Sequence, residues 1–316
     1  MNNTRKKVGV ALGSGSAKGF AHIGVLQVLA EKGIPIDMIA GSSMGAIIGG
    51  IYACNTDLRL LTKLIAALNQ RKYFDITIRR NGGLLGGERM ELLIKTLTHD
   101  KSFSELEIPF FCAATDVETG ERLILKEGKL YSAIRASMSI PGVFVPVQHG
   151  AHLCVDGGVL DRVPCRPLLE AGADVVFGVD VGNRGDFSRI EKGSIRGVLD
   201  NCLNIMQWEI TKERTKDAHV MICPDIKKMR GLSNGRVEEA VALGRQAAEE
   251  KLPEMLRALR ENGIPLLPTN GDDDGDGELG RCRPLPGTEQ PQVVLPEIDG
   301  PDDDDDGELG RCRPIP

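Results

Sequence analysis

Short apolar segments alternate with longer helical patterns along most of the chain, and this alternation limits the folds open to it. Segments such as Lys6–Leu12, Ile34–Ala40 and Asp174–Val181 are largely apolar and lie next to glycines, as is typical of strands. Because they are apolar at successive positions, both faces of their sheet must be covered. Strands joined by helices in this way predict an α/β fold with a mostly parallel sheet.

The alternation continues from residue 5 to residue 265 without an internal boundary, which predicts one domain over residues 1–268. Residues 269–316 are different, because they lack aromatic residues and are rich in Pro, Gly and Asp. Within them, Asp276–Pro286 recurs as Asp306–Pro316 with one Leu replaced by Ile. Such a segment cannot bury enough apolar surface to offset its ordering entropy, so we expect a disordered tail.

The formal net charge of −6 is unevenly distributed between these two parts. Residues 269–316 hold ten Asp, four Glu and four Arg, so they carry −10 and residues 1–268 carry +4. Nucleic-acid binding depends on a clear excess of Lys and Arg, which this chain lacks. We therefore expect no nucleic-acid partner.

The uncharged stretch from Met38 to Thr56 is not expected to span a membrane. It contains four glycines, two adjacent serines and an asparagine, which make it too polar for the interior of a bilayer. A strand, a tight turn and a buried helix account for it better. The eight cysteines include no Cys-x-x-Cys pair, which favours reduced thiols. We expect a cytoplasmic protein whose only membrane contact is peripheral, at the inner face, and the sequence does not indicate an oligomeric state.

Both copies of the tail repeat contain Asp-x-Asp-x-Asp-Gly, at Asp272–Gly277 and Asp302–Gly307. This is the front half of an EF-hand loop. The twelfth position should be a bidentate Glu, yet it is Arg283 in one copy and Arg313 in the other, and no helical pattern flanks the loops. We therefore expect neither a specific calcium site nor another metal or organic cofactor.

The segment Gly41–Gly45 fits the pattern Gly-x-Ser-x-Gly at the junction of a predicted strand and a predicted buried helix. A sharp turn there would lift Ser43 clear of the sheet edge and crowd its neighbours, which must then be small. The helix would also direct free N–H groups and its positive dipole end to the same place. Ser43 is thus a candidate nucleophile, and the alternative is a Gly/Ser turn that only begins a close-packed helix.

A second loop of glycines and serines runs from Gly13 to Gly19, one strand earlier. It is not a P-loop, because no Gly-Lys-Ser/Thr follows, and it fits only a lengthened form of the Rossmann fingerprint. With Asp37 about twenty residues on, dinucleotide binding remains one interpretation. The other is an oxyanion hole, since adjacent parallel strands would place this loop beside Ser43.

A nucleophilic serine needs a base, and Asp156 is the better candidate. Only His219 follows Asp156, as a Ser–Asp–His order requires, and it begins a strand-like run. His22 lies in the helix after the glycine loop, where packing is its expected role. A carboxylate can act alone when burial raises its pKa, although a plain turn is the alternative for Asp-Gly-Gly.

Four blocks in this order resemble the patatin-like phospholipases. Ser14–Gly19 looks like the family's Gly-Gly-Gly-x-Arg/Lys-Gly oxyanion segment, and Gly41–Gly45 looks like its nucleophile elbow. Ala136–Phe144 looks like a further shared block, and Asp156–Gly158 looks like the family's Asp-Gly-Gly/Ala. The resemblance runs from Lys7 to about Gly182, and more weakly to about Asn262.

The resemblance implies a three-layer α/β/α sandwich and a Ser–Asp dyad, with Ser43 as nucleophile and Asp156 as base. It also implies an oxyanion hole of backbone N–H groups around Gly15 and Ser16, with Lys18 at the family's basic position. Ser14 and Ser16 replace glycines of the family pattern, and a serine held at positive φ would be strained. The other motif positions are Gly13, Gly19, Gly41, Gly45, Gly157 and Gly158.

These features predict a serine acyl-ester hydrolase that acts on lipids, as a phospholipase, lysophospholipase or esterase. Its expected partner is a lipid or acyl-ester substrate, whose class the sequence does not name. A regulatory or lipid-binding protein on the same scaffold, with weak or no turnover, is the alternative. An NAD(P)-binding oxidoreductase is the third hypothesis, and nothing in Asp156–Gly158 would serve it.

Overall fold

The computed structural model describes residues 5–67, 87–182, 185, 187, 195–226 and 236–269. The predicted tail, apart from Thr269, lies outside the described residues, and so do both Asp-rich repeats. Within the described part, no helix combines the length and the apolar character that crossing a membrane requires.

The described strands form one eight-stranded sheet in the order β5-β6-β3-β2-β1-β7-β8, with β4 paired to β3. Their bounds are Val8–Leu12 (β1), Met38–Ser42 (β2), Phe110–Asp116 (β3), Arg122–Leu125 (β4), Val147–His149 (β5), His152–Asp156 (β6), Val175–Val179 (β7) and Val220–Ile222 (β8). The five strands from β3 to β8 along this order pair in parallel, whereas β4, β5 and β6 are antiparallel additions at one edge. The predicted mostly parallel sheet is confirmed.

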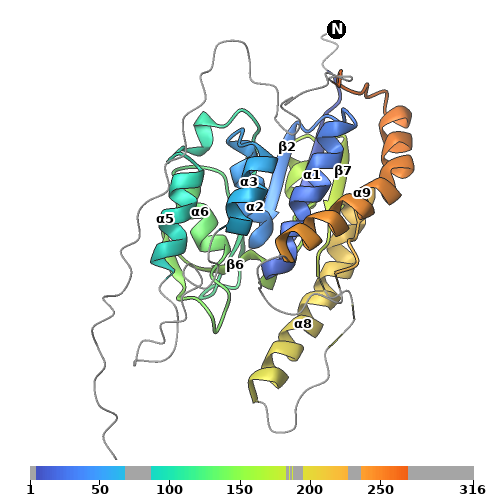
Figure 1. Cartoon of the computed structure of the whole chain (residues 1–316). Helices are drawn as coiled ribbons and strands as arrows, with labels where there is room; N and C mark the ends of the chain where they lie inside the picture. The colour runs from blue at the N-terminus through green and yellow to red at the C-terminus, as the bar shows by residue number, and fades with distance from the viewer. Residues whose placement is uncertain are drawn as a thin grey trace, which may run out of the picture.

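Helices cover both faces of this sheet, but unequally. One face carries α1, α2 and α9, as Figure 1 shows, while the short α7 packs on β1, β2 and β7 from the other face. The helices are Ala21–Glu31 (α1), Met44–Ala53 (α2), Leu58–Ala67 (α3), Glu88–Leu97 (α5), Leu130–Ser137 (α6), Arg166–Glu170 (α7), Ile195–Arg214 (α8) and Arg236–Glu261 (α9). Short 3-10 helices are Ser16–Phe20 (η1), Phe103–Glu105 (η2), Gly157–Val159 (η3) and Thr215–Asp217 (η4).

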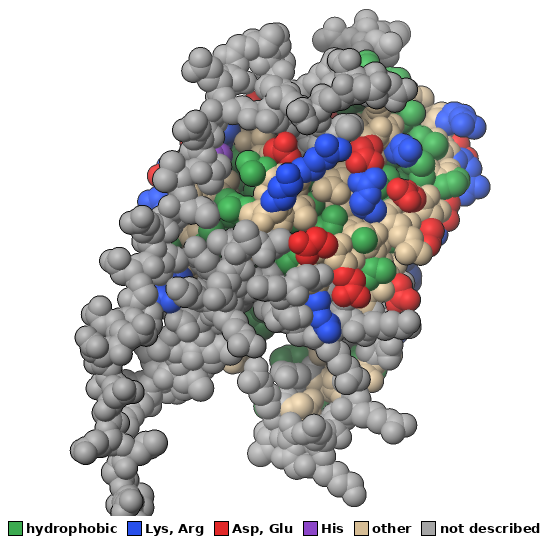
Figure 2. Space-filling view, in the orientation of Figure 1, with side chains coloured by type: hydrophobic (Ala, Val, Ile, Leu, Met, Phe, Trp, Pro, Cys, Tyr) green, Lys and Arg blue, Asp and Glu red, His purple; other side chains and the backbone are tan. Residues whose placement is uncertain are grey.

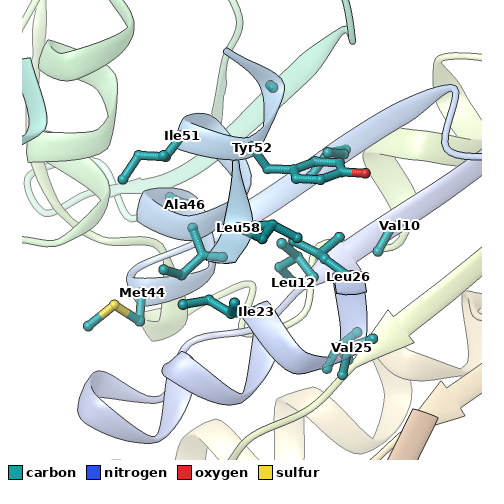
Figure 3. Packing of buried hydrophobic residues seen from close by; sticks show 14 of the residues in the cluster. Val10, Leu12, Ile23, Val25, Leu26, Met44, Ala46, Ile51, Tyr52 and Leu58 are labelled. Atoms are coloured by element: carbon teal, nitrogen blue, oxygen red, sulfur yellow. The ribbon is translucent and has the colours of Figure 1, made fainter. Parts of the chain in front are cut away.

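The central strands are buried on both faces because their side chains alternate between two cores. Val10 and Leu12 of β1 join the larger core, while Ala11 between them joins the smaller one with Leu168 of α7. Figure 3 shows the larger core, in which Ile23 of α1 packs between Leu12 and the residues of α2. This explains why these strands are apolar at successive positions rather than at alternate ones.

Several element boundaries differ from those predicted, and two of these differences have a clear structural basis. The predicted strand Ile34–Ala40 begins only at Met38, because Pro35 has no N–H for the ladder and Asp37 accepts a hydrogen bond from the Val8 amide at 2.7 Å. The helix predicted after the glycine loop begins at Ala21 and is preceded by η1, so the second half of the glycine loop is itself helical.

Candidate active site

Ser43 occupies a sharp turn between β2 and α2, with φ 55° and ψ −120°. Its N–H donates a hydrogen bond to Oγ of Ser137, the last residue of α6, at 2.9 Å. The turn is packed so closely that a Cβ on Gly45 would lie 2.1 Å from the Leu12 carbonyl oxygen. A Cβ on Gly41 would lie 2.5 Å from the Gly45 carbonyl oxygen, so both positions accept only glycine. Ser43 therefore has the strained geometry of a nucleophile elbow.

Asp156 lies at the end of β6, and the register of β6 and β2 against β3 places it beside Ser43. Ser42 pairs with Ala113 of β3, and Asp156 pairs with the next residue of the same strand, Ala114. The Asp156 carboxylate accepts a hydrogen bond from the Gly158 amide at 2.7 Å, and the Ser43 side chain is close enough to lower its pKa. Ser43 is 4% exposed and Asp156 is 6% exposed. The fold thus brings together, in a buried place, the two side chains singled out from the sequence.

Burial raises the pKa of Asp156 from 3.8 to about 6. The hydrogen bonds from Ser43 and the Gly158 amide, together with the positive charge of Arg162, oppose this rise. Burial is the largest effect because the charged form loses its hydration, whereas hydrogen bonds and positive charge stabilise that form. A carboxylate with a pKa near neutrality is suited to accept a proton from a hydroxyl group.

The loop after β1 lies against both of these residues. The Gly13 amide donates to the Val179 carbonyl at 3.0 Å and the Ser14 amide to the Arg162 carbonyl at 2.9 Å, which fixes the start of the loop. The Ser14 hydroxyl donates to the Ser42 hydroxyl oxygen at 2.9 Å. A Cβ on Gly158 would lie 2.4 Å from Ser14 Oγ, so the Asp-Gly-Gly turn touches the loop as well.

The middle of the loop presents the amides that the family resemblance assigns to an oxyanion hole. Within the described part of the chain, no backbone acceptor lies in hydrogen-bonding reach of the Gly15 and Ser16 amides. Ser16 has a φ of 48°, so one of the two serines that replace family glycines does adopt positive φ, whereas Ser14 does not. The backbone amide of Lys18 donates a hydrogen bond to the Gly15 carbonyl at 3.1 Å.

Gly19, the last residue of the predicted loop, packs against the start of α2. A Cβ on Gly19 would lie 2.3 Å from Cγ of Met44, the first residue of α2. The glycine loop and the elbow are therefore in direct van der Waals contact.

Two histidines have the structural roles predicted for them. His22 is fully buried, and burial lowers its pKa to about 4, so its ring is neutral and its Nε2 donates to the Gly13 carbonyl at 2.7 Å. It holds the start of the glycine loop. Nδ1 of His219 accepts a hydrogen bond from the Val176 amide at 3.1 Å, at the pairing of β7 and β8.

Sequence reasoning gave no role to two residues that organise the site. Ser137 anchors the Ser43 amide, and its only signal in the sequence is its place in the block Ala136–Phe144. Arg162 accepts the Ser14 amide with its carbonyl, and its guanidinium lies 3.3 Å from Gln207 and 3.8 Å from Asp180. No motif marks Arg162, so only the fold reveals it.

Other acidic residues are used elsewhere in the fold. Asp37 caps the Val8 amide and pairs with Arg5, at the amino end of β1, whereas the glycine loop follows its carboxyl end. It is therefore unable to serve a dinucleotide at that loop. Asp116 accepts amides of its own turn and a hydrogen bond from Nδ1 of His152 at 2.8 Å, so it stabilises that turn. Among the described residues, no group of three or more His, Cys, Asp or Glu side chains is placed to hold a metal ion.

Several known proteins are similar to this chain in sequence. A patatin-like phospholipase domain-containing protein of Caenorhabditis elegans is 36% identical over 188 residues, which are 57% of this chain and 14% of that protein. An uncharacterised NTE family protein of Mycobacterium tuberculosis is 38% identical over 178 residues, 55% of this chain and 49% of that protein. Lysophospholipase NTE1 of Candida glabrata is 28% identical over 310 residues, 86% of this chain and 17% of that protein. The chain thus corresponds to less than half the length of each relative.

The fold is also similar to that of a solved structure. VipD from Legionella pneumophila superposes with a TM-score of 0.52 at 15% identity, over 79% of this chain and 67% of that one. Residues 10–169 match the family described as patatin-like phospholipase, a range that holds the glycine loop, the elbow and the Asp-Gly-Gly turn. Because this match covers half of the chain, the protein belongs to the patatin-like phospholipase family.

Proposed function

We propose that this protein hydrolyses acyl-ester bonds of lipids with Ser43 as nucleophile and Asp156 as general base. The observation that carries the proposal is that the strand register brings these two buried side chains together, where the pKa of the Asp156 carboxyl group is raised to about 6. Above that pH the carboxylate is ionised and accepts a proton. The relatives named lysophospholipases support a lipid ester as the substrate class.

The reaction uses groups that already meet in the site. Asp156 takes the Ser43 proton as Oγ attacks the ester carbonyl carbon, and the carbonyl oxygen becomes an oxyanion facing the Gly15 and Ser16 amides. The C–O bond to the alcohol breaks, and Asp156 returns the proton to the leaving oxygen. A water molecule then gives its proton to Asp156 and attacks the acyl-Ser43 ester, and Asp156 returns that proton to Ser43 Oγ as the fatty acid is released.

No histidine takes part in this scheme. His22 and His219 each have one ring nitrogen committed to the backbone, and burial keeps the ring of His22 neutral. A Ser–Asp dyad is therefore a better account of the site than a Ser–Asp–His triad. In this scheme the amides of the glycine loop must bind the oxyanion, because the amide of Ser43 already donates to Ser137.

A substrate panel with a covalent probe tests the assignment. We expect a fluorophosphonate to label the wild-type protein and hydrolysis of lysophospholipids, phospholipids or short p-nitrophenyl esters to be measurable. Ser43→Ala should abolish both labelling and hydrolysis, and Asp156→Asn should lower hydrolysis by at least about a thousandfold. Ser132→Ala, on the helix that also carries Ser137, is the matched control and should keep wild-type activity.

The outcome that contradicts the proposal is equally specific. If the folded wild-type protein shows neither labelling nor hydrolysis, a lipid-binding or regulatory role on the same scaffold replaces it. If Asp156→Asn keeps wild-type activity, the base is another group and the dyad is wrong.

A further inference from the structure

Helix α8 exposes more apolar surface than any other described element. Of the eleven large hydrophobic side chains that are exposed in the described residues, five lie within nine consecutive positions of this one helix. They are Val198, Leu199, Leu203, Ile205 and Met206, hereafter the α8 stripe. Leu199 and Met206 are each 59% exposed. Scattered exposed hydrophobic residues are ordinary, but a contiguous group of this kind marks an interaction site.

The stripe lies on the side of α8 that faces away from the protein. On the opposite side, Gln207 bonds Arg162 at 3.3 Å, Thr211 is buried and Arg214 lies 3.7 Å from the Asp161 carboxylate. A surface helix of a globular protein normally turns its apolar side inward and its polar side outward. In the first half of α8 this polarity is reversed.

The middle of the helix carries no charge, while Arg196 and Asp200 lie in its first turns. Residues 201–208 are all uncharged, whereas the last turns carry the ion pairs Glu209–Lys212 and Glu213–Lys216. Figure 2 shows how different the face covered by α9 is, where Lys and Arg side chains are interspersed with Asp and Glu. The α8 stripe is therefore a distinct apolar surface and not a sample of the general surface.

The helix that carries this surface adjoins the candidate active site. Helix α8 packs against η3, which directly follows Asp156, and its Gln207 contacts the guanidinium of Arg162. The Arg162 carbonyl in turn holds the Ser14 amide of the glycine loop. Figure 1 shows the N-terminal half of α8 extending beyond the other described helices at the lower end of the molecule.

We propose that the α8 stripe docks into the surface of a lipid aggregate, such as a micelle or bilayer, and holds that surface beside Ser43. The proposal rests on the proposed function, because only a lipid substrate gives a role to an apolar stripe on the helix that packs beside Asp156. The uncharged run of residues 201–208 suits the acyl region, while the charged last turns suit water and head groups. The five side chains present on the order of 400 Å², about half of the ~800 Å² that each partner buries in a stable dimer.

Vesicle flotation tests the docking without turnover. In a Ser43→Ala background, the protein should float with phosphatidylcholine vesicles, which have no net charge. Adding Leu199→Gln and Met206→Gln should weaken this binding at least about tenfold, because polar side chains do not enter the acyl region. The matched control is Leu266→Gln with Leu267→Gln, two leucines of similar exposure, 47% and 49%, beyond the end of α9. It should bind like the Ser43→Ala parent.

A probe on the stripe gives a second measurement that needs no stripe substitution. Cys202 is exposed on α8 between the stripe residues, and an environment-sensitive fluorophore attached to it in a Cys282→Ser, Cys312→Ser protein should shift its emission to the blue on adding vesicles. The same label on Leu266→Cys, with Cys202→Ser added, should not shift.

Two results would overturn the docking. The first is equal vesicle binding by the Leu199→Gln, Met206→Gln protein, or an unshifted Cys202 label. The second is a dimer in sedimentation experiments that these two substitutions convert to a monomer, because a second copy of the chain then covers the stripe. Failure of the proposed function is separate, since absent hydrolysis with stripe-dependent flotation leaves a lipid-binding protein.

Discussion

The burial of Asp156 suits it to act as a base but lowers the stability of the folded protein. Its pKa is raised from 3.8 to about 6 by burial, so the unfolded chain loses this proton at lower pH than the folded protein. The free energy of unfolding therefore falls as pH rises from about 4 to about 6, and the full penalty is present above pH 6. Asp156→Asn removes it, and we expect a gain of on the order of 1–3 kcal/mol near pH 7.5.

Urea unfolding at two pH values checks this prediction. The stability gain of Asp156→Asn should disappear below about pH 4, where the carboxyl group of wild-type Asp156 is protonated in both the folded and the unfolded state. Equal stability of Asp156→Asn and wild type at pH 7.5 would show that the carboxylate is well solvated, and a buried base would then be excluded.

Ser16 is the second residue at which local strain has a measurable cost. Its φ of 48° favours glycine, which the family pattern has at this position. We expect Ser16→Gly to raise the free energy of unfolding by about 0.5–1 kcal/mol, after the greater freedom of glycine in the unfolded chain is subtracted. Ser14→Gly is the control with the opposite sign, because it removes the 2.9 Å bond to Ser42 without relieving positive φ. A loss in both variants would contradict the strain argument.

At the scale of elements, the elbow between β2 and α2 depends on α6. Ser137, at the end of α6, accepts the Ser43 amide at 2.9 Å and is fully buried. Ser137→Ala leaves that N–H without an acceptor, so we expect about 1–3 kcal/mol lower stability and roughly tenfold lower kcat with little change in KM. Ser132→Ala on the same helix should change neither, and full activity in Ser137→Ala would mean that the turn holds its own shape.

The central elements could be predicted because their signals are local. Glycine marks the ends of β1, and the Gly-x-Ser-x-Gly pattern marks the elbow, so Ser43 needs no knowledge of the rest of the fold. The edge formed by β4, β5 and β6 was not predicted as antiparallel, since the register of Asp156 against Ala114 is set by non-local pairing. For the same reason, no local signal could assign Ser137 or Arg162 to the site.

Helix α8 shows the complementary limit of sequence patterns. Its residues predict a helix over 195–217, close to the observed Ile195–Arg214 and η4. The apolar spacing of Val198, Leu199 and Met206 is that of an ordinary buried face, and only the structure shows that this side faces solvent. Periodicity identifies the amphipathic side of a helix but not what covers it.

At the scale of the whole molecule, the uneven distribution of charge predicts how the tail affects stability, activity and membrane binding. The described part ends at Thr269, and the Leu267 amide donates to the Gly33 carbonyl at 2.7 Å, so the chain is tied to the body up to that point. We propose that the division between body and tail falls just beyond it. Removing residues 270–316 should leave the melting temperature and hydrolysis of soluble esters unchanged.

The same truncation removes a charge of −10 and leaves a body of +4, so binding to anionic phosphatidylglycerol vesicles should rise. Replacing the five aspartates 302–306 by asparagine in the full chain should give part of that rise, because it removes half of the tail's net charge without shortening it. Both effects should fade as salt is added, whereas docking of the α8 stripe to uncharged phosphatidylcholine should not. Lost hydrolysis of soluble esters in the truncated protein would instead place the tail within the catalytic fold.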